Sequence, residues 1–191
     1  ELLRRARENG LPITAEATPH HLLLCDEDLP GPDPDFKMNP PLRGPADRDA
    51  LINAIADGTI SCLATDHAPH AREAKARGFL RAPFGVVGLE TAIGATWEAL
   101  VVSGRMRPVD WVRRWTAGPA AVLGRPTPSL AVGAPAAVVV IEPDRPWRVD
   151  PSRFRSLSRN TPFAGRTFHA RPVALFLRGR FIDLGLGATP A

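Results

Sequence analysis

The sequence has no tyrosine, only two cysteines and only two lysines among its 24 basic residues. The cysteines, Cys25 and Cys62, lie in unlike contexts and do not indicate a disulfide framework, so we expect a reducing, cytoplasmic environment. No run of apolar residues approaches the length that a membrane-spanning helix needs, which argues against an integral membrane protein.

The basic residues do not indicate a nucleic-acid partner, although the net charge is +4 and the isoelectric point is about 10.0. Nearly all of them are arginines, and they are scattered along the chain rather than clustered. Without tyrosine, and with little interleaving of phenylalanine among the arginines, the sequence lacks the stacking platform that binds single strands. We therefore expect neither a nucleic-acid partner nor a membrane partner.

The first part of the chain alternates helical and strand-like patterns. The expected elements are helices at 1–9, 46–56, 89–102 and 109–115 and strands at 11–18 and 59–64. Long loops, at 26–41 and at 65–85, follow the two strands and are rich in proline and glycine. Repeated βα units of this kind predict a parallel sheet whose active face is built by the loops after the strands.

The pattern changes beyond residue 125. A strand is expected at 136–141, and a hairpin is expected from 173–177 and 181–183. We therefore expect two parts, the βα units of residues 1–125 and a small β module of residues 126–191.

Three ionisable side chains, Asp66, His67 and His70, lie within five positions at the end of the second strand. Pro69 lacks a backbone donor and fixes its own φ, so the chain must turn there and hold both imidazoles near the strand end. A lone aspartate in this place would more often cap a turn or a helix. With two histidines beside it, the group favours a hydrolytic metal site, where a carboxylate can also accept and return the proton of a water molecule.

Two other motifs offer polar groups, and each has a structural alternative. His20 and His21 follow the first strand and could bind a metal, orient the true ligands, or only pack and cap a turn. In segment 37–43, two prolines after Asn39 hold its amide ready for a ligand, while basic residues, Lys37 among them, offer cations to an anionic substrate. Taken alone, this segment is explained more simply as a loop with solvated charges.

The motifs around these residues extend along nearly the whole chain. They are TAEATPHHLLL at 14–24, KMNPPLR at 37–43, GTISCLATDHAPH at 58–70, APFGVVGLET at 82–91 and NTPFAGR at 160–166. Together they resemble dihydroorotases of the longer, bacterial type, in the cyclic amidohydrolase superfamily. The resemblance implies an α/β fold: the C-terminal part of a metal-dependent (β/α)8 TIM barrel plus part of a small composite β-sandwich domain.

The resemblance also implies a reaction, the reversible zinc-dependent cyclisation of N-carbamoyl-L-aspartate to dihydroorotate in pyrimidine (UMP) biosynthesis. Asp66 matches the aspartate that binds zinc and serves as catalytic acid and base. Asn39 and His70 match groups that hold the substrate, and Phe84 and Gly85 match the loop whose backbone contacts the pyrimidine ring.

Several parts of the family's site have no counterpart in this sequence. The His-x-His motif, the bridging carboxylate or carboxylated lysine, two further ligand histidines and the substrate-binding arginine are missing, so the remaining ligands for one or two zinc ions are expected upstream. His20 and His21 match a family motif that does not ligate the metal, which removes the metal interpretation of that pair. We expect a carboxyl-terminal half that is inactive by itself and has exposed sheet edges.

The expected partners are a small-molecule substrate and either a second copy of the chain or aspartate transcarbamoylase. A hydantoinase or allantoinase is a close alternative, but Asn39 and His70 suit a substrate with an extra carboxylate. A non-catalytic dihydroorotase-like scaffold of aspartate transcarbamoylase is the alternative from a different class. The presence of Asp66 together with Asn39 and His70 favours an enzyme.

Overall fold

Two short strands, β1 (Glu16–Ala17) and β2 (Cys62–Leu63), pair in parallel in the first part of the molecule. The structure is a computed structural model and describes residues 1–184. Backbone hydrogen bonds extend the pairing beyond the strands, for example from Ser61 N to Ala15 O at 2.9 Å. Both strands expected from the sequence are therefore present, but each is shorter than expected.

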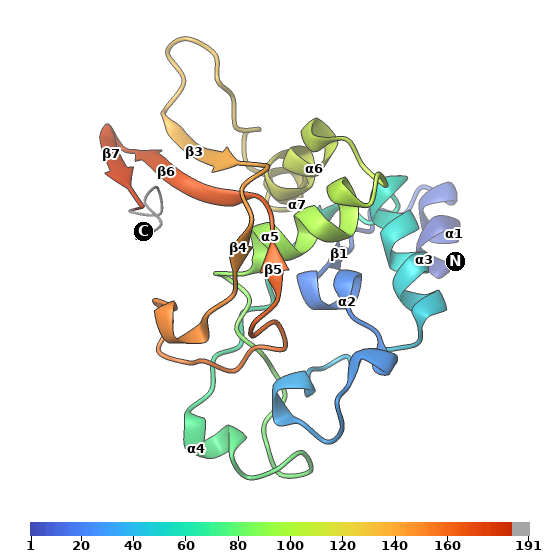
Figure 1. The fold of residues 1–191 in the computed structure, drawn as a ribbon. Coiled ribbons are helices and arrows are strands. Elements are labelled where there is room, and N and C mark those ends of the chain that lie inside the picture. Colours follow the sequence, from blue (N-terminus) through green and yellow to red (C-terminus); the bar gives the residue numbers. More distant parts are fainter. Residues whose placement is uncertain (185–191) are drawn as a thin grey trace.

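Several helices lie near this pair of strands, whereas α4 lies apart from it at the bottom of Figure 1. The helices are α1 (Leu2–Glu8), α2 (Pro19–Leu23), α3 (Pro45–Ala56), α4 (Arg72–Lys75), α5 (Ala92–Trp97), the π-helical η3 (Glu98–Val102), α6 (Pro108–Trp115) and α7 (Ala117–Val122), with short 3-10 turns η1 (Asp26–Asp28), η2 (Pro34–Phe36) and η4 (Pro151–Arg153). The four expected helices are confirmed, because α5 and η3 together form most of the helix expected at 89–102. No helix among residues 1–184 is both long and apolar enough to cross a membrane.

Helix α2 takes the place of the turn that was expected after the first strand. Thr18 is its N-cap residue, and its hydroxyl oxygen accepts the backbone N–H of His21 at 3.5 Å. Pro19 occupies the first helical turn, where its missing N–H costs nothing. A helix of five residues is unstable alone, so α2 depends on the packing of Leu22, which is 1% exposed.

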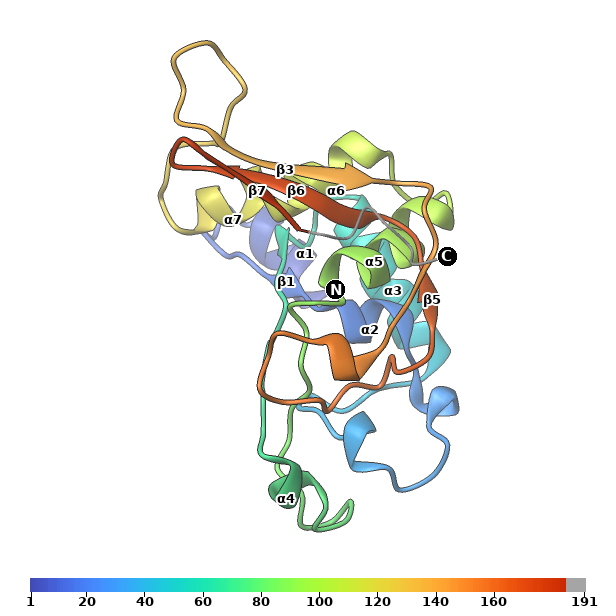
Figure 2. The same ribbon diagram turned by 60° about the vertical axis from the view of Figure 1, so that its left-hand side comes forward.

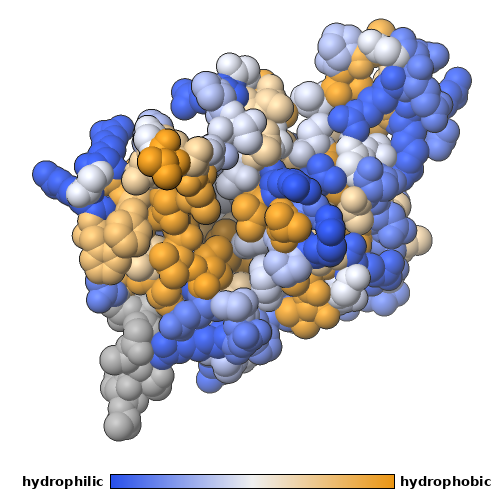
Figure 3. Space-filling model, turned by 90° about the horizontal axis from the view of Figure 1, so that it is seen from above, coloured by the Kyte–Doolittle hydropathy of each residue, from blue (hydrophilic) through white to orange (hydrophobic). Residues whose placement is uncertain are grey.

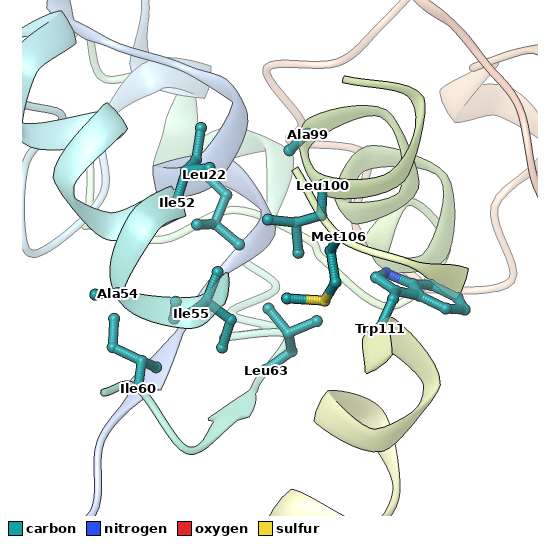
Figure 4. Packing of buried hydrophobic residues seen from close by; sticks show 11 residues of the cluster. Leu22, Ile52, Ala54, Ile55, Ile60, Leu63, Ala99, Leu100, Met106 and Trp111 are labelled. Atoms are coloured by element: carbon teal, nitrogen blue, oxygen red, sulfur yellow. The ribbon is translucent and has the colours of Figure 1, made fainter. Parts of the chain in front are cut away.

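A core of apolar side chains joins the helices to β2 (Figure 4). Leu22 of α2, Ile55 of α3, Leu63 of β2, Leu100 of η3 and Trp111 of α6 belong to it, and each is at most 3% exposed. Burial of side chains of this size contributes about 1.5–3 kcal/mol each. This core therefore fixes the end of β2 relative to the surrounding helices.

The loops that follow β1 and β2 extend toward the same end of the molecule, at the bottom of Figures 1 and 2. This placement follows from the parallel pairing, because the carboxyl ends of parallel strands share one edge of a sheet. An isolated parallel bridge between His67 and Val86 brings the segment before α5 alongside the loop after β2. The expected catalytic and substrate-binding residues all lie on these loops.

The second part contains an antiparallel sheet in the order β3-β6-β7, formed by β3 (Ala137–Glu142), β6 (Arg171–Leu177) and β7 (Arg180–Asp183). The expected strand at 136–141 and the expected hairpin are confirmed. No residue of these strands is fully buried, and the apolar side chains of Val139, Phe176 and Phe181 are 51%, 42% and 61% exposed. Figure 3, which looks down on this end of the molecule, shows apolar side chains gathered at the surface.

A second antiparallel pair, β4 (Trp147–Arg148) and β5 (Thr167–Phe168), returns the chain to the first part. The side chains around it share a buried cluster with residues of the loops after β1 and β2: Val149, Phe154, Phe163 and Phe168 with Leu24, Met38, Val86 and Val87. The division between residues 1–125 and 126–191 stays a prediction, and residues 147–168 pack against the first of these parts.

Candidate active site

Asp66 lies just beyond the end of β2 and has a left-handed backbone conformation, with φ of 48°. Aspartate tolerates this conformation better than most residues because its short carboxylate can form local hydrogen bonds. The side chain is 44% exposed and lines a hollow together with Thr18, His21 and Asn39. The carboxylate is therefore accessible at the carboxyl end of a parallel strand, where the sequence placed it.

His20, in α2, lies against Asp66 and is 1% exposed. Its Nε2 atom is 3.5 Å from Oδ2 of Asp66 and has no hydrogen-bond partner among the described residues. Burial of the ring, and the neighbouring His21, lower the pKa of His20 to about 3. The ring is therefore neutral near pH 7, and this contact is not an ion pair. The neutral ring of His20 therefore lies beside the carboxylate of Asp66 without a hydrogen bond between them.

His21 fixes the segment that carries Asn39. Its Nε2 lies 2.8 Å from the carbonyl oxygen of Pro40, and its Nδ1 lies 2.6 Å from the hydroxyl of Thr18. Because a carbonyl oxygen can only accept, Nε2 must carry the proton, and in the neutral ring Nδ1 accepts from Thr18. Both nitrogens of His21 are thus occupied by protein groups, which agrees with removing the metal interpretation of this residue.

Three of the expected substrate-binding residues are next to one another. His70 Nε2 donates to the carbonyl oxygen of Phe84 at 2.7 Å, again because the carbonyl can only accept. A Cβ atom at Gly85 would lie 2.5 Å from Cβ of Ala68 and 3.0 Å from Nε2 of His70, so only glycine fits there. Asn39, the fourth residue, lines the hollow that contains Asp66.

Lys37 differs from the expectation that its charge is offered to a substrate. Its side chain is buried, and its Nζ atom donates to the carbonyl oxygens of Leu80 at 3.1 Å and Ala82 at 2.7 Å. Its own carbonyl oxygen accepts the N–H of Gly85 at 2.9 Å. Lys37 therefore connects segment 37–43 to the loop that carries Phe84 and Gly85.

His67, the remaining ionisable residue of the 65–70 motif, holds backbone groups. Its Nδ1 accepts the N–H groups of Gly88 at 3.1 Å and Leu89 at 3.3 Å, so this nitrogen is not protonated. The ring connects the loop after β2 to the segment that leads into α5. Within the 65–70 motif, Asp66 therefore presents an accessible carboxylate, while the imidazoles of His67 and His70 bind backbone atoms.

Two residues of the site were missed by the sequence reasoning. The side-chain amide of Asn160 donates to the carbonyl oxygen of Gly85 at 2.9 Å, and the backbone N–H of His70 donates to Ser158 Oγ at 3.3 Å and to Asn160 Oδ1 at 3.4 Å. Ser158 and Asn160 are each 6% exposed. Asn160 begins the NTPFAGR motif, which contributed to the family resemblance but gave no sign of this contact across 75 residues.

The described residues do not form a complete set of metal ligands. Among residues 1–184, no group of three or more histidine, cysteine, aspartate or glutamate side chains could hold a metal ion. Zinc sites use three or four protein ligands, and a carboxylate oxygen is one of the accepted types. The accessible carboxylate of Asp66 fits one such position.

The sequence profile described as "Amidohydrolase family" matches residues 2–182, which is nearly all of the chain. The chain belongs to the amidohydrolase family. It is 49% identical over 184 residues to a dihydroorotase of Halalkalibacterium halodurans, and 48% identical over 184 residues to a dihydroorotase of Bacillus caldolyticus. Each match covers 95% of this chain and 42% of the relative. The resemblance to dihydroorotases is therefore confirmed.

This amidohydrolase chain also resembles a solved structure, the L-hydantoinase of Arthrobacter aurescens, with a TM-score of 0.88 and 29% identity. That match covers 95% of this chain and 42% of the hydantoinase chain. The expected amidohydrolase barrel part is thereby confirmed. The chain spans less than half of the length of the relatives that it matches, and β1 and β2 are the parallel strands that it contributes.

Proposed function

We propose that this amidohydrolase chain is the carboxyl-terminal part of a dihydroorotase. The complete enzyme would interconvert dihydroorotate and N-carbamoyl-L-aspartate in pyrimidine biosynthesis. The observation that carries the proposal is the hollow shared by Asp66 and Asn39, which extends from Thr59 and Ile60, before β2, to Asp66, beyond the carboxyl end of this parallel strand. The similarity to curated dihydroorotases supports it.

Asp66 would act both as a zinc ligand and as the group that moves the proton. Zinc, when bound, supplies Lewis-acid activation of water and of the ring carbonyl. The carboxylate of Asp66 accepts one proton as water adds to the carbonyl carbon, and it returns this proton to the ring nitrogen as the C–N bond breaks. The buried ring of His20, whose Nε2 lies 3.5 Å from Oδ2, would limit the movement of this carboxylate by packing beside it. The other ligands for one or two zinc ions would come from the portion of the relatives that this chain does not span.

The substrate would lie between the accessible carboxylate of Asp66 and the segment that carries Phe84 and Gly85. Asn39 and His70 would bind the substrate's carboxylate and ring, and the backbone at Phe84 and Gly85 would contact the ring. The absence of a side chain at Gly85 allows this backbone to approach a ligand closely. His70 donates to Phe84 through Nε2, so in the neutral ring Nδ1 would accept an N–H of the substrate ring, and it would donate to the substrate's carboxylate only when the imidazole carries both protons.

A hydantoinase is the second candidate, favoured by the structural similarity to the L-hydantoinase. Hydantoins and dihydroorotate are both cyclic amides, so Asp66 would perform the same proton transfer on either. The two candidates differ in the carboxylate of dihydroorotate, which Asn39 and His70 would bind.

Assembly and cellular location form the remaining part of the proposal. Residues 126–191 would contribute to a composite β-sandwich, which would cover the apolar side chains of β3, β6 and β7. The complete protein would form a homodimer or associate with aspartate transcarbamoylase. A cytoplasmic location is supported by Cys25 and Cys62, which are both buried and free.

The test is a substrate comparison on the full-length protein together with analysis of its zinc content. We expect bound zinc, and a kcat/KM for dihydroorotate at least about 100-fold higher than for hydantoin, because unpaired polar groups penalise the substrate without the carboxylate. A preference for hydantoin would overturn the dihydroorotase assignment in favour of the second candidate. A zinc-free protein that hydrolyses neither compound would indicate a non-catalytic scaffold.

A further inference from the structure

The loop at 79–85, which carries Phe84 and Gly85, is held through its backbone carbonyl groups by two ammonium groups. Lys37 Nζ donates to Leu80 O at 3.1 Å and to Ala82 O at 2.7 Å, as described above. Lys75 Nζ, at the end of α4, donates to Pro83 O at 3.3 Å and to Gly85 O at 2.8 Å. Four of the seven carbonyl groups in this loop therefore accept from a lysine.

These two residues, Lys37 and Lys75, are the only lysines in the sequence. They are 9% and 6% exposed, although lysine is almost never fully buried without a partner. A compact ammonium group with three donors can reach several converging carbonyl oxygens, whereas the flat guanidinium of arginine suits a carboxylate or phosphate. In a chain that otherwise uses arginine for its positive charge, both lysines occur where this geometry is needed.

Burial of these charges has a cost that the loop contacts must offset. Desolvation by burial lowers the pKa of Lys75, and Asp35 and Asp33 are the carboxylates whose charges oppose this effect. Lys37 gains a further contact, since its Nζ lies 4.6 Å from the ring centre of Phe84. Each ammonium group therefore makes specific contacts with the part of the loop that precedes or includes Gly85.

We propose that Lys37 and Lys75 are positioning residues, which fix Phe84 and Gly85 relative to Asn39 and His70 for binding of a cyclic amide substrate. The inference rests on the proposed function for its substrate. Residue 37 also joins the two segments through its backbone, because its carbonyl oxygen accepts the N–H of Gly85 and Asn39 is only two residues away. Lys37 and Lys75 thus couple the loop at 79–85, which follows β2, to segment 37–43, which follows β1.

Substitution of each lysine by methionine, in the full-length protein, tests the proposal. Lys37→Met and Lys75→Met keep an unbranched side chain but remove the donors, and Arg77→Met, at an exposed basic residue beside α4, is the matched control. Amide hydrogen exchange of the peptide covering 79–86 reports the loop independently of activity. Dihydroorotate KM and kcat, zinc content and the melting temperature are measured on the same samples.

We expect exchange in the 79–86 peptide to be about tenfold faster or more in each lysine variant, given the strength of hydrogen bonds from charged groups. Dihydroorotate KM should rise by about tenfold, with a smaller change in kcat and with the zinc content unchanged. Arg77→Met should resemble the parent. If one lysine variant does not fold, the other still provides the test, because each holds two different carbonyl groups.

If amide hydrogen exchange of the 79–86 peptide is unchanged in both lysine variants, the two lysines do not hold the loop, and the proposal is wrong. Faster exchange with unchanged KM would overturn the positioning role, because the loop would then be free to move without affecting substrate binding. If the parent itself does not hydrolyse dihydroorotate, the proposed function fails, and hydrogen exchange alone then decides whether the two lysines hold the loop.

Discussion

The parallel-strand part of this chain and its antiparallel sheet differ in how their apolar side chains are covered. Around β1 and β2, helices from the same chain bury Leu63, Leu100 and Trp111 almost completely. In the β3-β6-β7 sheet, Val139 and Phe181 remain more than half exposed among the described residues. Exposed apolar patches of this kind usually mark surfaces that another segment or partner covers.

Function and stability are therefore expected to depend on the first part of the chain more than on the antiparallel sheet. The polar groups of the candidate site lie on loops that follow the buried strands of the first part. Packing within the chain therefore fixes their positions. The antiparallel sheet contributes none of the expected catalytic or substrate-binding residues. Variants in the two parts should therefore differ in both the kind and the size of their effects.

The largest expected effect is on catalysis, from Asp66→Asn in the full-length protein. Loss of the proton-transfer group should lower kcat by about 100-fold to 10,000-fold while the melting temperature stays near that of the parent. The matched control is Glu142→Gln, the same chemical change on β3, which should leave kcat unchanged. A kcat within tenfold of the parent for Asp66→Asn would contradict the acid–base role.

The next effect is on stability, from Leu100→Ala in the core of the first part. Removal of a fully buried leucine side chain should lower the free energy of unfolding by about 2–5 kcal/mol, measured by urea denaturation of the full-length protein. Phe181→Lys on β7 should cost more than about 0.5 kcal/mol in the full-length protein, because the proposed composite sandwich would cover this side chain. A smaller cost would show that Phe181 stays exposed in the full-length protein, which would count against the composite sandwich.

A smaller effect is expected on substrate binding, from His70→Ala. The variant removes the donor to Phe84 O and one substrate contact, so dihydroorotate KM should rise by about tenfold. Zinc content should stay at the parent value, since Asp66 rather than His70 is the proposed ligand. Loss of zinc in parallel with loss of binding would overturn this division between the two residues.

The smallest effect is a pH dependence at the surface of the first part. Hydrogen bonds from Thr59, and the guanidinium of Arg4 at 2.6 Å, lower the pKa of Asp57 to about 2. Because the folded-state pKa is depressed, the stabilisation is present above the usual aspartate pKa of about 3.8 and is lost as the pH falls through about 2. The pair is exposed, so its contribution should be below about 1 kcal/mol.

Urea denaturation of the parent and of Asp57→Asn checks this pH dependence. The parent should be the more stable protein at pH 5, and the difference should shrink toward pH 2.5. A difference that is equal at both pH values would show that the charge of Asp57 contributes nothing.

The sequence predicted those parts of the fold that depend on local pattern. The helix at 46–56 and the hairpin around Arg178 were found where periodicity and turn residues place them. Helix α2 was missed because its start depends on Thr18 and Pro19 directly after a strand of only two residues. The strands β4 and β5 were missed because they lie in a stretch rich in proline and arginine, without a longer apolar run like the one that contains β2.

The candidate site shows the same limit. The placement of Asp66 was predictable from a carboxylate after a buried apolar run. The contacts of Lys37, Lys75 and Asn160 with the loop at 79–85 were not, because they join segments that are distant in the sequence. Charge alone suggested that Lys37 faces a substrate, whereas its burial shows that it binds the backbone.

The hydrogen bond from Asn160 to Gly85 has a consequence for how this polypeptide can be divided. A boundary at residue 125, which composition favours, would separate the two ends of that bond and would also remove Ser158 from His70. A gene split or recombined at such a boundary would keep Asp66 with its own strand but would lose the hydrogen bonds that join residues 158–160 to His70 and to the loop at 79–85. Segments exchanged between related enzymes should therefore carry residues 58–91 and 158–166 as one inherited unit.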